Sequence, residues 1–242
     1  MNGPTATSEQ PTAGLNDRQV WDDEYRIVQA IPSTIRVNPS KALLLAETLL
    51  NFQVIRRVFD AGTGNGRNAV HLAARPCTVV GADFSPLALL RAQDLARRAR
   101  LDGRTLLVRL NLLEELPFDD GVFDLCLDSY VSCHFLENVN FLKYWHELSR
   151  VVRKDGYIFT SMFATDDEYL AGIKDPEQFD GYRIVTDPRN GITKRVLDET
   201  QFETLFPKPL EMRYLLKFQF SDMVVGEIFR RSLLIAILQK PA

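Results

Sequence analysis

The sequence predicts an α/β fold, a doubly wound three-layer sandwich in which helices cover both faces of a mostly parallel sheet. Short apolar segments alternate with amphipathic segments of helical spacing between residues 54 and 163, and this alternation is typical of βαβ units. The first apolar segment runs directly into a glycine-rich turn, where open α/β sheets bind ligands. The chain has 242 residues, 45% of them apolar, so a single domain can bury a sizeable core.

Two helices are expected before the alternating region. Aromatic and aliphatic side chains recur at near-helical spacing over residues 17–30, which favours a short amphipathic helix. A second helix is expected to begin at Asn38 and Pro39, because asparagine caps free backbone amides and proline suits the first helical position.

Strands and helices then alternate along the chain. Apolar and β-branched runs predict the strands, helical periodicity predicts the helices, and Ser85-Pro86 marks a helix start. The expected strands are 54–60, 78–83, 104–110, 122–130 and 156–163, and the expected helices are 67–74, 85–101 and 141–153. After Phe163 the alternation lapses into a polar, glycine-containing stretch. It resumes with a helix at 200–205 and strands at 211–220 and 232–239.

The composition excludes several kinds of partner. The chain has 29 Lys and Arg against 32 Asp and Glu, a formal charge of −3, so no bulk positive field attracts nucleic acid or a membrane surface. The three cysteines form neither a disulfide framework nor a CxxC pair, and we expect no metal site. Residues 1–15 are rich in Pro, Thr, Ser and Gly and lack a secretory signal, which predicts a disordered tail and a cytoplasmic protein.

A glycine-rich turn follows the first predicted strand. Gly62, Gly64 and Gly66 alternate in the segment DAGTGNGR (60–67), which permits a tight turn with positive φ and a close approach of the backbone to a ligand. A dinucleotide-binding turn would have its third glycine at the position of Arg67, whose long side chain would crowd a pyrophosphate. The spacing therefore favours a nucleoside ligand without a pyrophosphate.

Asp83 ends the next predicted strand, about 20 residues after the glycines. From this place a carboxylate can accept hydrogen bonds from both hydroxyls of a ribose. The glycine turn and Asp83 together indicate a nucleoside-binding site, although a glycine turn by itself is common.

These motifs resemble those of the class I S-adenosylmethionine-dependent methyltransferases. The matching segments follow the family's order over residues 54–163: Asp60–Gly66, Gly81–Ser85, Asn111–Leu113, Leu116–Phe118, Phe123–Leu125 and Glu147–Gly156. The resemblance implies a seven-stranded sheet whose last strand is antiparallel. It also implies S-adenosylmethionine as the cofactor and S-adenosylhomocysteine as its product.

The resemblance implies a role for each matching residue at the cofactor. The loop would hold the methionine part, Asp83 the ribose, and Asn111 the adenine amino group, where the family usually has an aspartate. Phe84 and Leu112 would enclose the adenine, or pack in the core. Asp128 would bind the cofactor's ammonium, or cap the next turn. The loop residues concerned are Asp60, Gly62, Thr63, Gly64, Asn65 and Gly66.

The residues after the fourth predicted strand are candidates for the methyl-transfer site. His134 titrates near neutrality and can serve as a general base, or as a structural hydrogen-bonding residue. Tyr130 would shape the acceptor pocket. Trp21, Tyr25 and Tyr182 lie in two segments that mix aromatic and acidic side chains, which would suit a small aromatic or amine-bearing acceptor.

We therefore expect a methyltransferase that acts on an O, N or S atom of a small-molecule metabolite, as a monomer or homodimer. The alternatives are an NAD-binding Rossmann oxidoreductase and an inactive member of the fold that serves as a binding module. Residues 16–242 are expected to form one domain, with lid helices at 16–52, the cofactor-binding core at 54–163 and an acceptor-side insertion at 164–200.

Overall fold

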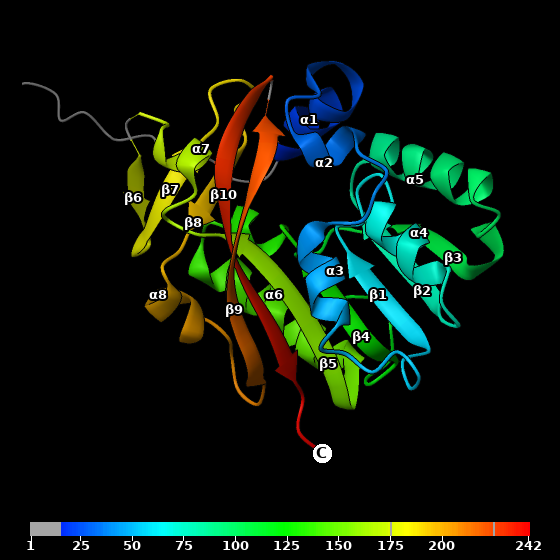
Figure 1. Cartoon of the computed structure of the whole chain (residues 1–242). Helices are drawn as coiled ribbons and strands as arrows, with labels where there is room; N and C mark the ends of the chain where they lie inside the picture. The colour runs from blue at the N-terminus through cyan, green and yellow to red at the C-terminus, as the bar shows by residue number, and fades with distance from the viewer. Residues whose placement is uncertain (1–15, 175, 225) are drawn as a thin grey trace, which may run out of the picture.

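A seven-stranded sheet forms the centre of the computed structural model, which describes residues 16–174, 176–224 and 226–242 (Figure 1). The strand order is β3-β2-β1-β4-β5-β10-β9. β10 is antiparallel to β5 and to β9, whereas β1 to β5 pair in parallel. The strands are β1 (Arg57–Ala61), β2 (Thr78–Asp83), β3 (Thr105–Arg109), β4 (Phe123–Ser129), β5 (Val152–Phe163), β9 (Glu211–Val224) and β10 (Glu227–Gln239). The predicted fold, with its antiparallel last strand, is confirmed.

Helices cover both faces of this sheet because its strands alternate apolar side chains between the two sides. Val58 packs with the helices α3 (Lys41–Glu47) and α4 (Arg67–Ala73), while its neighbour Phe59 packs on the opposite face with α6 (Asn138–Val151) and α8 (Glu199–Glu203). α5 (Pro86–Arg98) lies beside α4. The described part of the chain contains no helix of the length and apolarity needed to cross a membrane.

The segment before the sheet differs in detail from its prediction. The expected helix over 17–30 is an α-helix, α1 (Asn16–Asp23), continued by a π-helical turn, η1 (Glu24–Val28), and a short helix α2 (Pro32–Ile35) follows. α3 begins after Ser40 rather than at Asn38, because the Ser40 hydroxyl accepts a hydrogen bond from the Leu43 amide at 3.1 Å. The predicted tail, residues 1–15, lies outside the described residues.

A second, three-stranded sheet follows β5, where the sequence predicted only a polar stretch. Its strands are β6 (Glu177–Phe179), β7 (Tyr182–Thr186) and β8 (Thr193–Val196), preceded by α7 (Glu168–Ala171). The buried residues of β8 include charged ones: Arg195 is 0% exposed, lies over the Phe141 and Tyr182 rings, and donates to the Phe135 and Leu136 carbonyls at 2.6 Å. Strands whose inward side chains are charged lack the apolar alternation that predicts a strand.

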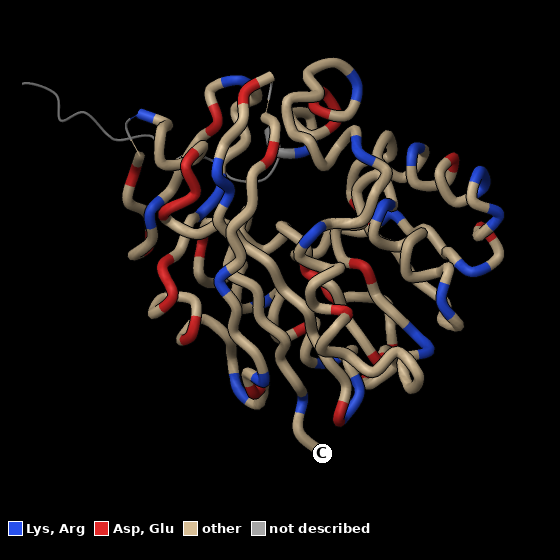
Figure 2. The backbone as a smooth tube through the Cα atoms, viewed as in Figure 1, with Lys and Arg blue, Asp and Glu red and all other residues tan. Residues whose placement is uncertain are grey.

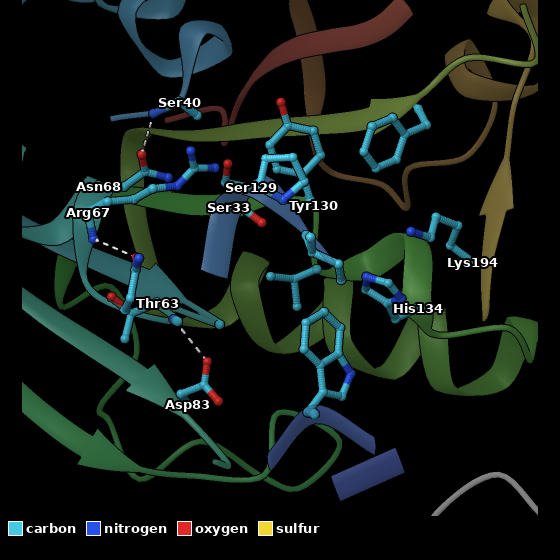
Figure 3. A pocket seen from close by; sticks show the side chains of 18 of the residues that line it. Ser33, Ser40, Thr63, Arg67, Asn68, Asp83, Ser129, Tyr130, His134 and Lys194 are labelled. Atoms are coloured by element: carbon cyan, nitrogen blue, oxygen red, sulfur yellow. Dashed lines mark hydrogen bonds between the residues drawn. The ribbon is translucent and has the colours of Figure 1, made fainter. Parts of the chain in front are cut away.

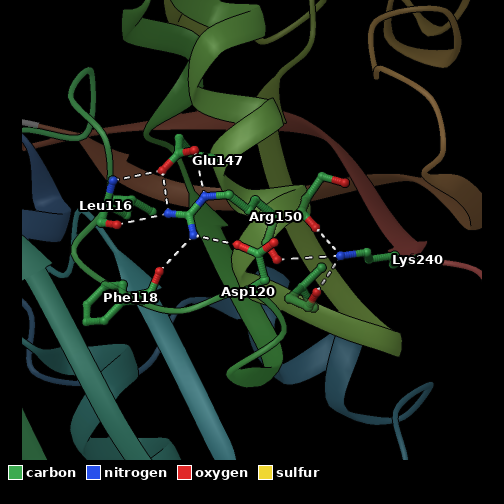
Figure 4. Close-up of polar contacts among 8 residues, drawn as sticks. Leu116, Phe118, Asp120, Glu147, Arg150 and Lys240 are labelled. Carbon is green, nitrogen blue, oxygen red and sulfur yellow. Dashed lines mark hydrogen bonds and ion pairs between the residues drawn. The ribbon is translucent and has the colours of Figure 1, made fainter.

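Charged side chains also fasten the loops at the amino ends of the parallel strands (Figure 4). Arg150 on α6 donates to the carbonyls of Leu116 and Phe118 at 2.9 and 2.7 Å and pairs with Glu147 at 2.8 Å. Near the carboxyl end of the chain, Lys240 donates to the Ser149 and Val152 carbonyls at 2.8 and 3.0 Å. These bonds satisfy carbonyls that neither a strand nor a helix uses.

The charges on α5 are mainly arginines, at the right of Figure 2. Arg98 pairs with Asp94 on the exposed side at 2.6 Å. Arg91 turns the other way and donates to the carbonyls of Tyr25 and Thr34 in the N-terminal segment. The helix therefore uses one arginine to hold the N-terminal segment over the sheet.

The contact between α4 and α5 depends on Gly66, which precedes α4 and packs against Ala92 of α5. A substitution at Gly66 therefore tests this packing. Gly66 has φ +80°, and a Cβ there would lie 2.7 Å from the Ala92 Cβ and 2.9 Å from the Ala92 Cα. Gly66→Ala is expected to lower the free energy of unfolding by about 2 kcal/mol or more, through backbone strain and overpacking.

Urea denaturation measures this effect. Gly103→Ala is the matched control, because no atom lies within 4 Å of a Cβ at Gly103, and its free energy of unfolding should stay within about 0.5 kcal/mol of wild type. Equal transition midpoints for the two variants would contradict the packing described for Gly66.

Candidate cofactor and acceptor site

A cavity of about 1180 Å³ opens at the carboxyl ends of the parallel strands. The glycine loop after β1, the ends of β2 and β4, and residues of β5, β8 and β10 line it, and the N-terminal segment 18–41 covers it. Figure 3 shows Thr63 and Asp83 on one side and His134 and Lys194 on the other, with Tyr130 between the two groups. This volume is large enough for two small ligands side by side.

Asp83 ties the end of β2 to the glycine loop. Its carboxylate accepts hydrogen bonds from the amides of Gly64 and Ser85, both at 2.9 Å. Burial raises the pKa of Asp83 to about 6, since the amide hydrogen bonds offset the loss of water only in part. The carboxylate lines the cavity and keeps free lone pairs for further donors.

The glycine loop packs so closely against Val131 and Tyr25 that Gly62 and Gly64 have no room for a Cβ. Gly62 and Gly64 have φ +62° and +59°, and a Cβ on Gly64 would lie 2.6 Å from the Tyr25 hydroxyl. Gly62, Thr63, Gly64 and Asn65 all line the cavity. Their backbone and the neighbouring buried carboxylate of Asp83 form a cradle for a ligand with several hydroxyl and amide hydrogen-bonding groups.

The N-terminal segment is fastened to this loop as a lid. The Asn65 amide donates to the carbonyls of Thr34 and Arg36 at 3.3 and 2.8 Å, and the Ser85 hydroxyl donates to Asp22 at 2.5 Å. Arg67, the first residue of α4, lines the cavity beneath the lid. The lid therefore depends on the same loop that would hold a cofactor.

A buried carboxylate fastens the other side of the lid to the acceptor-side insertion. Glu24 is 0% exposed and accepts hydrogen bonds from the Ile31 amide at 2.7 Å and from the Asn190 side chain at 3.2 Å. Arg36 pairs with Asp222 of β9 at 2.7 Å. The lid thus spans the whole cavity, from the glycine loop to the small sheet.

Three residues predicted to surround an adenine also line the cavity. Phe84 follows Asp83, and Leu112 and Asn111 follow β3. The Asn111 carbonyl oxygen accepts a hydrogen bond from the Leu113 amide at 3.1 Å, and its amide donates to Glu114 at 3.0 Å. Asn111 is therefore held in a turn, with one lone pair of its oxygen still free.

Four predicted site residues lie outside the cavity lining. Asp128 takes the second of its two predicted roles: its buried carboxylate accepts hydrogen bonds from Ser132, Thr160 and Tyr144, so it caps the next turn. Tyr182 instead covers Arg195, and Gly66 packs on α5. Asp60 is buried beneath the loop, where it accepts a hydrogen bond from Thr63 at 2.7 Å.

His134 lies in the cavity in one defined tautomer. Its Nδ1 is 2.8 Å from the carbonyl oxygen of Thr193, and because a carbonyl only accepts, Nδ1 carries the hydrogen and Nε2 keeps a lone pair. Burial, together with the nearby Lys194 ammonium, lowers the pKa of His134 to about 3. The Trp21 ring contacts the imidazole edge on, with ring centroids 5.1 Å apart.

Tyr130 occupies the end of β4 with φ +64°, a left-handed conformation that is strained for a tyrosine. Its ring lies beside the Phe163 ring, with centroids 5.1 Å apart. Burial raises the pKa of Tyr130 to about 12, so the hydroxyl stays protonated at neutral pH. The strained backbone keeps this ring in the cavity between the predicted cofactor and acceptor sides.

The acceptor side also contains cations that the sequence reading missed. Lys194, Arg189 and Arg231 line the cavity. The acidic residues predicted to suit an amine are engaged instead: Asp167 pairs with Arg231 at 2.8 Å, and Asp166 pairs with Lys217 at 3.0 Å. Isolated basic residues in a polar stretch give no sequence signal, since such residues are most often solvated.

The residues present fit S-adenosylmethionine. The buried Asp83 carboxylate can accept from two ribose hydroxyls, the loop's bare backbone admits the methionine part, and the Arg67 guanidinium is available to a carboxylate. Phe84 and Leu112 provide apolar surface beside them. No contact in this arrangement requires Asp128.

The chain is similar in sequence to known methyltransferases. Residues 59–160 match the model of a family described as a methyltransferase domain. A ubiquinone/menaquinone biosynthesis C-methyltransferase from Citrifermentans bemidjiense is 32% identical over 112 residues, 45% of this chain and 46% of the relative. A sarcosine/dimethylglycine N-methyltransferase from Halorhodospira halochloris is 32% identical over 112 residues, 46% of this chain and 39% of the relative. The matching segment spans less than half of either relative's length.

Solved methyltransferase structures share the fold. The 1,6-didemethyltoxoflavin-N1-methyltransferase of Burkholderia thailandensis, solved with 1,6-didemethyltoxoflavin and S-adenosylhomocysteine bound, has a TM-score of 0.66 at 18% identity, covering 100% of this chain and 94% of its own. A S-adenosylmethionine-dependent methyltransferase from Methanosarcina mazei has a TM-score of 0.66 at 18% identity, covering 84% of this chain and 99% of its own.

The lowered pKa of His134 predicts a pH dependence of stability. Between pH values of about 6.5 and about 3 the unfolded chain protonates this residue and the folded chain does not, so stability falls as the pH falls. His134→Asn keeps a donor for the Thr193 carbonyl but does not titrate. The stability of wild type relative to the variant should therefore decline below about pH 6.5, by up to about 1.4 kcal/mol per pH unit.

Urea denaturation of both proteins at several pH values gives this difference directly. The two proteins differ only at residue 134, so the difference between their stabilities reports on this residue. A difference that is constant between about pH 7 and about pH 5 would show that His134 is protonated as readily in the folded chain as in the unfolded one.

Proposed function

Because this chain belongs to the class I S-adenosylmethionine-dependent methyltransferase family, we propose that it transfers a methyl group from S-adenosylmethionine to a small molecule held in the covered cavity. The main support for this proposal is that one cavity contains two different sets of side chains next to each other. Asp83 and the glycine loop form one part, and the aromatic and polar side chains around Tyr130 and His134 form the other.

The cover over the cavity favours a small acceptor. The lid and the small sheet enclose the acceptor side, and Glu24 joins them through Asn190. A macromolecular substrate could present only a tip to such a cavity. The similarity in fold to a methyltransferase solved with the small molecule 1,6-didemethyltoxoflavin supports the same interpretation.

The protein's part in the proposed reaction is mainly to bind and to orient. S-adenosylmethionine, when bound, supplies a methyl group on a sulfonium that transfers readily to an aligned lone pair. Asp83 would fix the ribose and the glycine loop the methionine part, so the reacting carbon would have one defined position. The lid would exclude water from the cavity. Alignment and exclusion of water lower the barrier without a proton transfer by the protein.

His134 and Tyr130 are the proposed residues of the transfer site. The lone pair on Nε2 of His134 can accept a hydrogen bond from an acceptor hydroxyl or amine, but the low pKa of His134 makes it a weak proton acceptor. The phenol of Tyr130 can donate a hydrogen bond and shape the pocket. Trp21 and Tyr25 of the lid would complete the acceptor and cofactor walls.

Binding of nicotinamide dinucleotide is disfavoured by the loop itself. Arg67 occupies the place of the third glycine of a dinucleotide turn, and its side chain lines the cavity under the lid. A guanidinium at this place suits one carboxylate but leaves less room for a pyrophosphate.

The proposed function predicts which nucleosides bind. Calorimetry with the purified chain should show binding of S-adenosylmethionine and S-adenosylhomocysteine and weaker or no binding of NAD, because the loop accommodates a nucleoside without a pyrophosphate. Mass spectrometry of metabolite extracts incubated with the chain and S-adenosylmethionine should reveal a product one CH₂ heavier than its precursor. Tighter binding of NAD than of S-adenosylhomocysteine would refute the proposal.

Asp83→Asn tests the proposed ribose contact. The substitution removes charge-assisted hydrogen bonds, so affinity for S-adenosylhomocysteine should fall by roughly tenfold or more at neutral pH. In wild type, affinity should weaken as the pH falls through about 6, the pKa to which burial raises Asp83, since the protonated carboxyl loses acceptor capacity. The variant should lack this pH dependence.

Asp94→Asn on the exposed side of α5 is the matched control, and it should bind like wild type at every pH because Asp94 pairs only with Arg98 among the described residues. The dissociation constants come from calorimetric titrations across the pH range. An Asp83→Asn protein that binds as tightly as wild type would place the ribose elsewhere.

A further inference from the structure

We propose that the acceptor is a planar molecule that binds as an anion, with its negatively charged oxygen held by Lys194 on the acceptor side of the cavity. This inference rests on the proposed function and specifies the chemical class of the acceptor. It differs from the amine-bearing acceptor that the sequence suggested.

Lys194 is a buried cation that points into the cavity. It comes from β8 of the small sheet, is 5% exposed, and lines the cavity opposite Asp83 (Figure 3). Its ammonium lies 5.4 Å from the centroid of the Phe163 ring. Neither a hydrogen bond nor an ion pair engages this ammonium among the described residues, and burial lowers the pKa of Lys194. A desolvated ammonium without a partner is costly, and an anionic ligand would remove that cost.

The carboxylates near Lys194 are already engaged by other cations. Asp187 pairs with Arg189 at 3.0 Å and accepts from the Tyr169 hydroxyl at 2.8 Å. Asp167 pairs with Arg231 at 2.8 Å and also accepts from the Ser232 and Leu170 amides. Both carboxylates act on Lys194 through space but form their ion pairs with arginines, so the ammonium remains available to a ligand.

Two further groups near the ammonium, His134 and Cys133, carry no charge at neutral pH. The pKa of His134 is lowered to about 3 and the pKa of the Cys133 thiol is raised to about 12, in both cases mainly by burial. Neither can supply a negative charge at neutral pH. The remaining neighbouring ion, Arg231, is itself positive and shares the Phe163 ring at 4.9 Å. The local field therefore favours an anion and repels an ammonium.

The shape of the acceptor side favours a planar ligand. The rings of Tyr130, Phe163 and Trp21 line this part of the cavity, and the His134 imidazole lies between Trp21 and the Thr193 carbonyl. Aromatic walls with a single charged group bind a flat conjugated molecule that carries one ionised oxygen. A phenolate, an enolate and an aryl carboxylate share this chemistry.

The carboxylate of the cofactor is the competing anion for Lys194. Arg67 directly follows the glycine loop and lines the cavity, and its guanidinium has no hydrogen-bond partner among the described residues. A cation is therefore available to the cofactor beside the loop, whereas Lys194 lies on the far side of Tyr130. This placement assigns Lys194 to the acceptor.

The test measures binding of probe molecules to the full chain by calorimetry, with and without saturating S-adenosylhomocysteine. The anionic probes are 4-nitrophenolate and benzoate, and the neutral probes of matching shape are nitrobenzene and benzamide. Wild type should bind at least one anion roughly tenfold or more tightly than its neutral match. 4-Nitrophenol also becomes yellow on ionisation, so its colour at a pH below its own pKa should deepen on binding.

Lys194→Met should remove this preference while leaving affinity for S-adenosylhomocysteine unchanged. Lys194→Arg should retain part of the preference, because it keeps the charge. Lys174→Met, at an exposed position outside the cavity, should behave as wild type. Thermal unfolding of each variant establishes that it is folded, and Lys194→Arg supplies the comparison if Lys194→Met is not.

Two results would overturn the inference. One is equal binding of the anionic and neutral probes by wild type. The other is a loss of S-adenosylhomocysteine affinity in Lys194→Met, which would assign Lys194 to the cofactor. Failure of wild type to bind S-adenosylhomocysteine would instead contradict the proposed function, and the probe titrations without that ligand would still decide the role of Lys194.

Discussion

The hydrogen bonds between the Asp83 carboxylate and the amides of Gly64 and Ser85 hold the site together. They join the ends of β1 and β2, which are neighbours in the sheet, and they position the loop from which Asn65 reaches the lid. The carboxylate performs this task while buried at the edge of a cavity, where its pKa rises to about 6. The Asp83 carboxylate therefore both holds the loop and is proposed to bind the ligand, so a substitution cannot alter one role without the other.

Buried charge is distributed unevenly across the cavity. On the lid side, Glu24 has its hydrogen bonds satisfied by a backbone amide and by Thr34 and Asn190. On the acceptor side, Asp167 and Asp187 are matched by arginines, and Lys194 remains without a partner among the described residues. Buried ions that have hydrogen-bond or ion-pair partners fix the walls of the cavity. A buried ion without such partners raises the affinity of the cavity for a ligand of opposite charge. The paired ions therefore build the cavity, and the unpaired Lys194 lies where the acceptor is proposed to bind.

The sequence predicted the sheet and the glycine turn well because both leave short-range signals. Apolar runs mark the parallel strands, and positive-φ turns require glycines such as Gly62 and Gly64. The acceptor side could not be predicted in the same way. β8 carries the buried Arg195 and Lys194, whose environment comes from Phe163, Tyr182 and distant loops. Asp128 was placed at the correct strand end, but its direction depends on Thr160 of the neighbouring strand, which sequence order does not reveal.

The lid has anchors on both sides of the cavity, at Asn65 of the glycine loop and at Asn190 of the insertion. A cover attached along two edges cannot swing open over one ligand while staying closed over the other. We therefore expect the proposed cofactor and acceptor to share a single entrance, and each turnover would exchange both ligands in the same opening event. The rate of product exchange would then depend on the breaking of a few hydrogen bonds of Glu24 and Asn65, which lie outside the proposed methyl-transfer site.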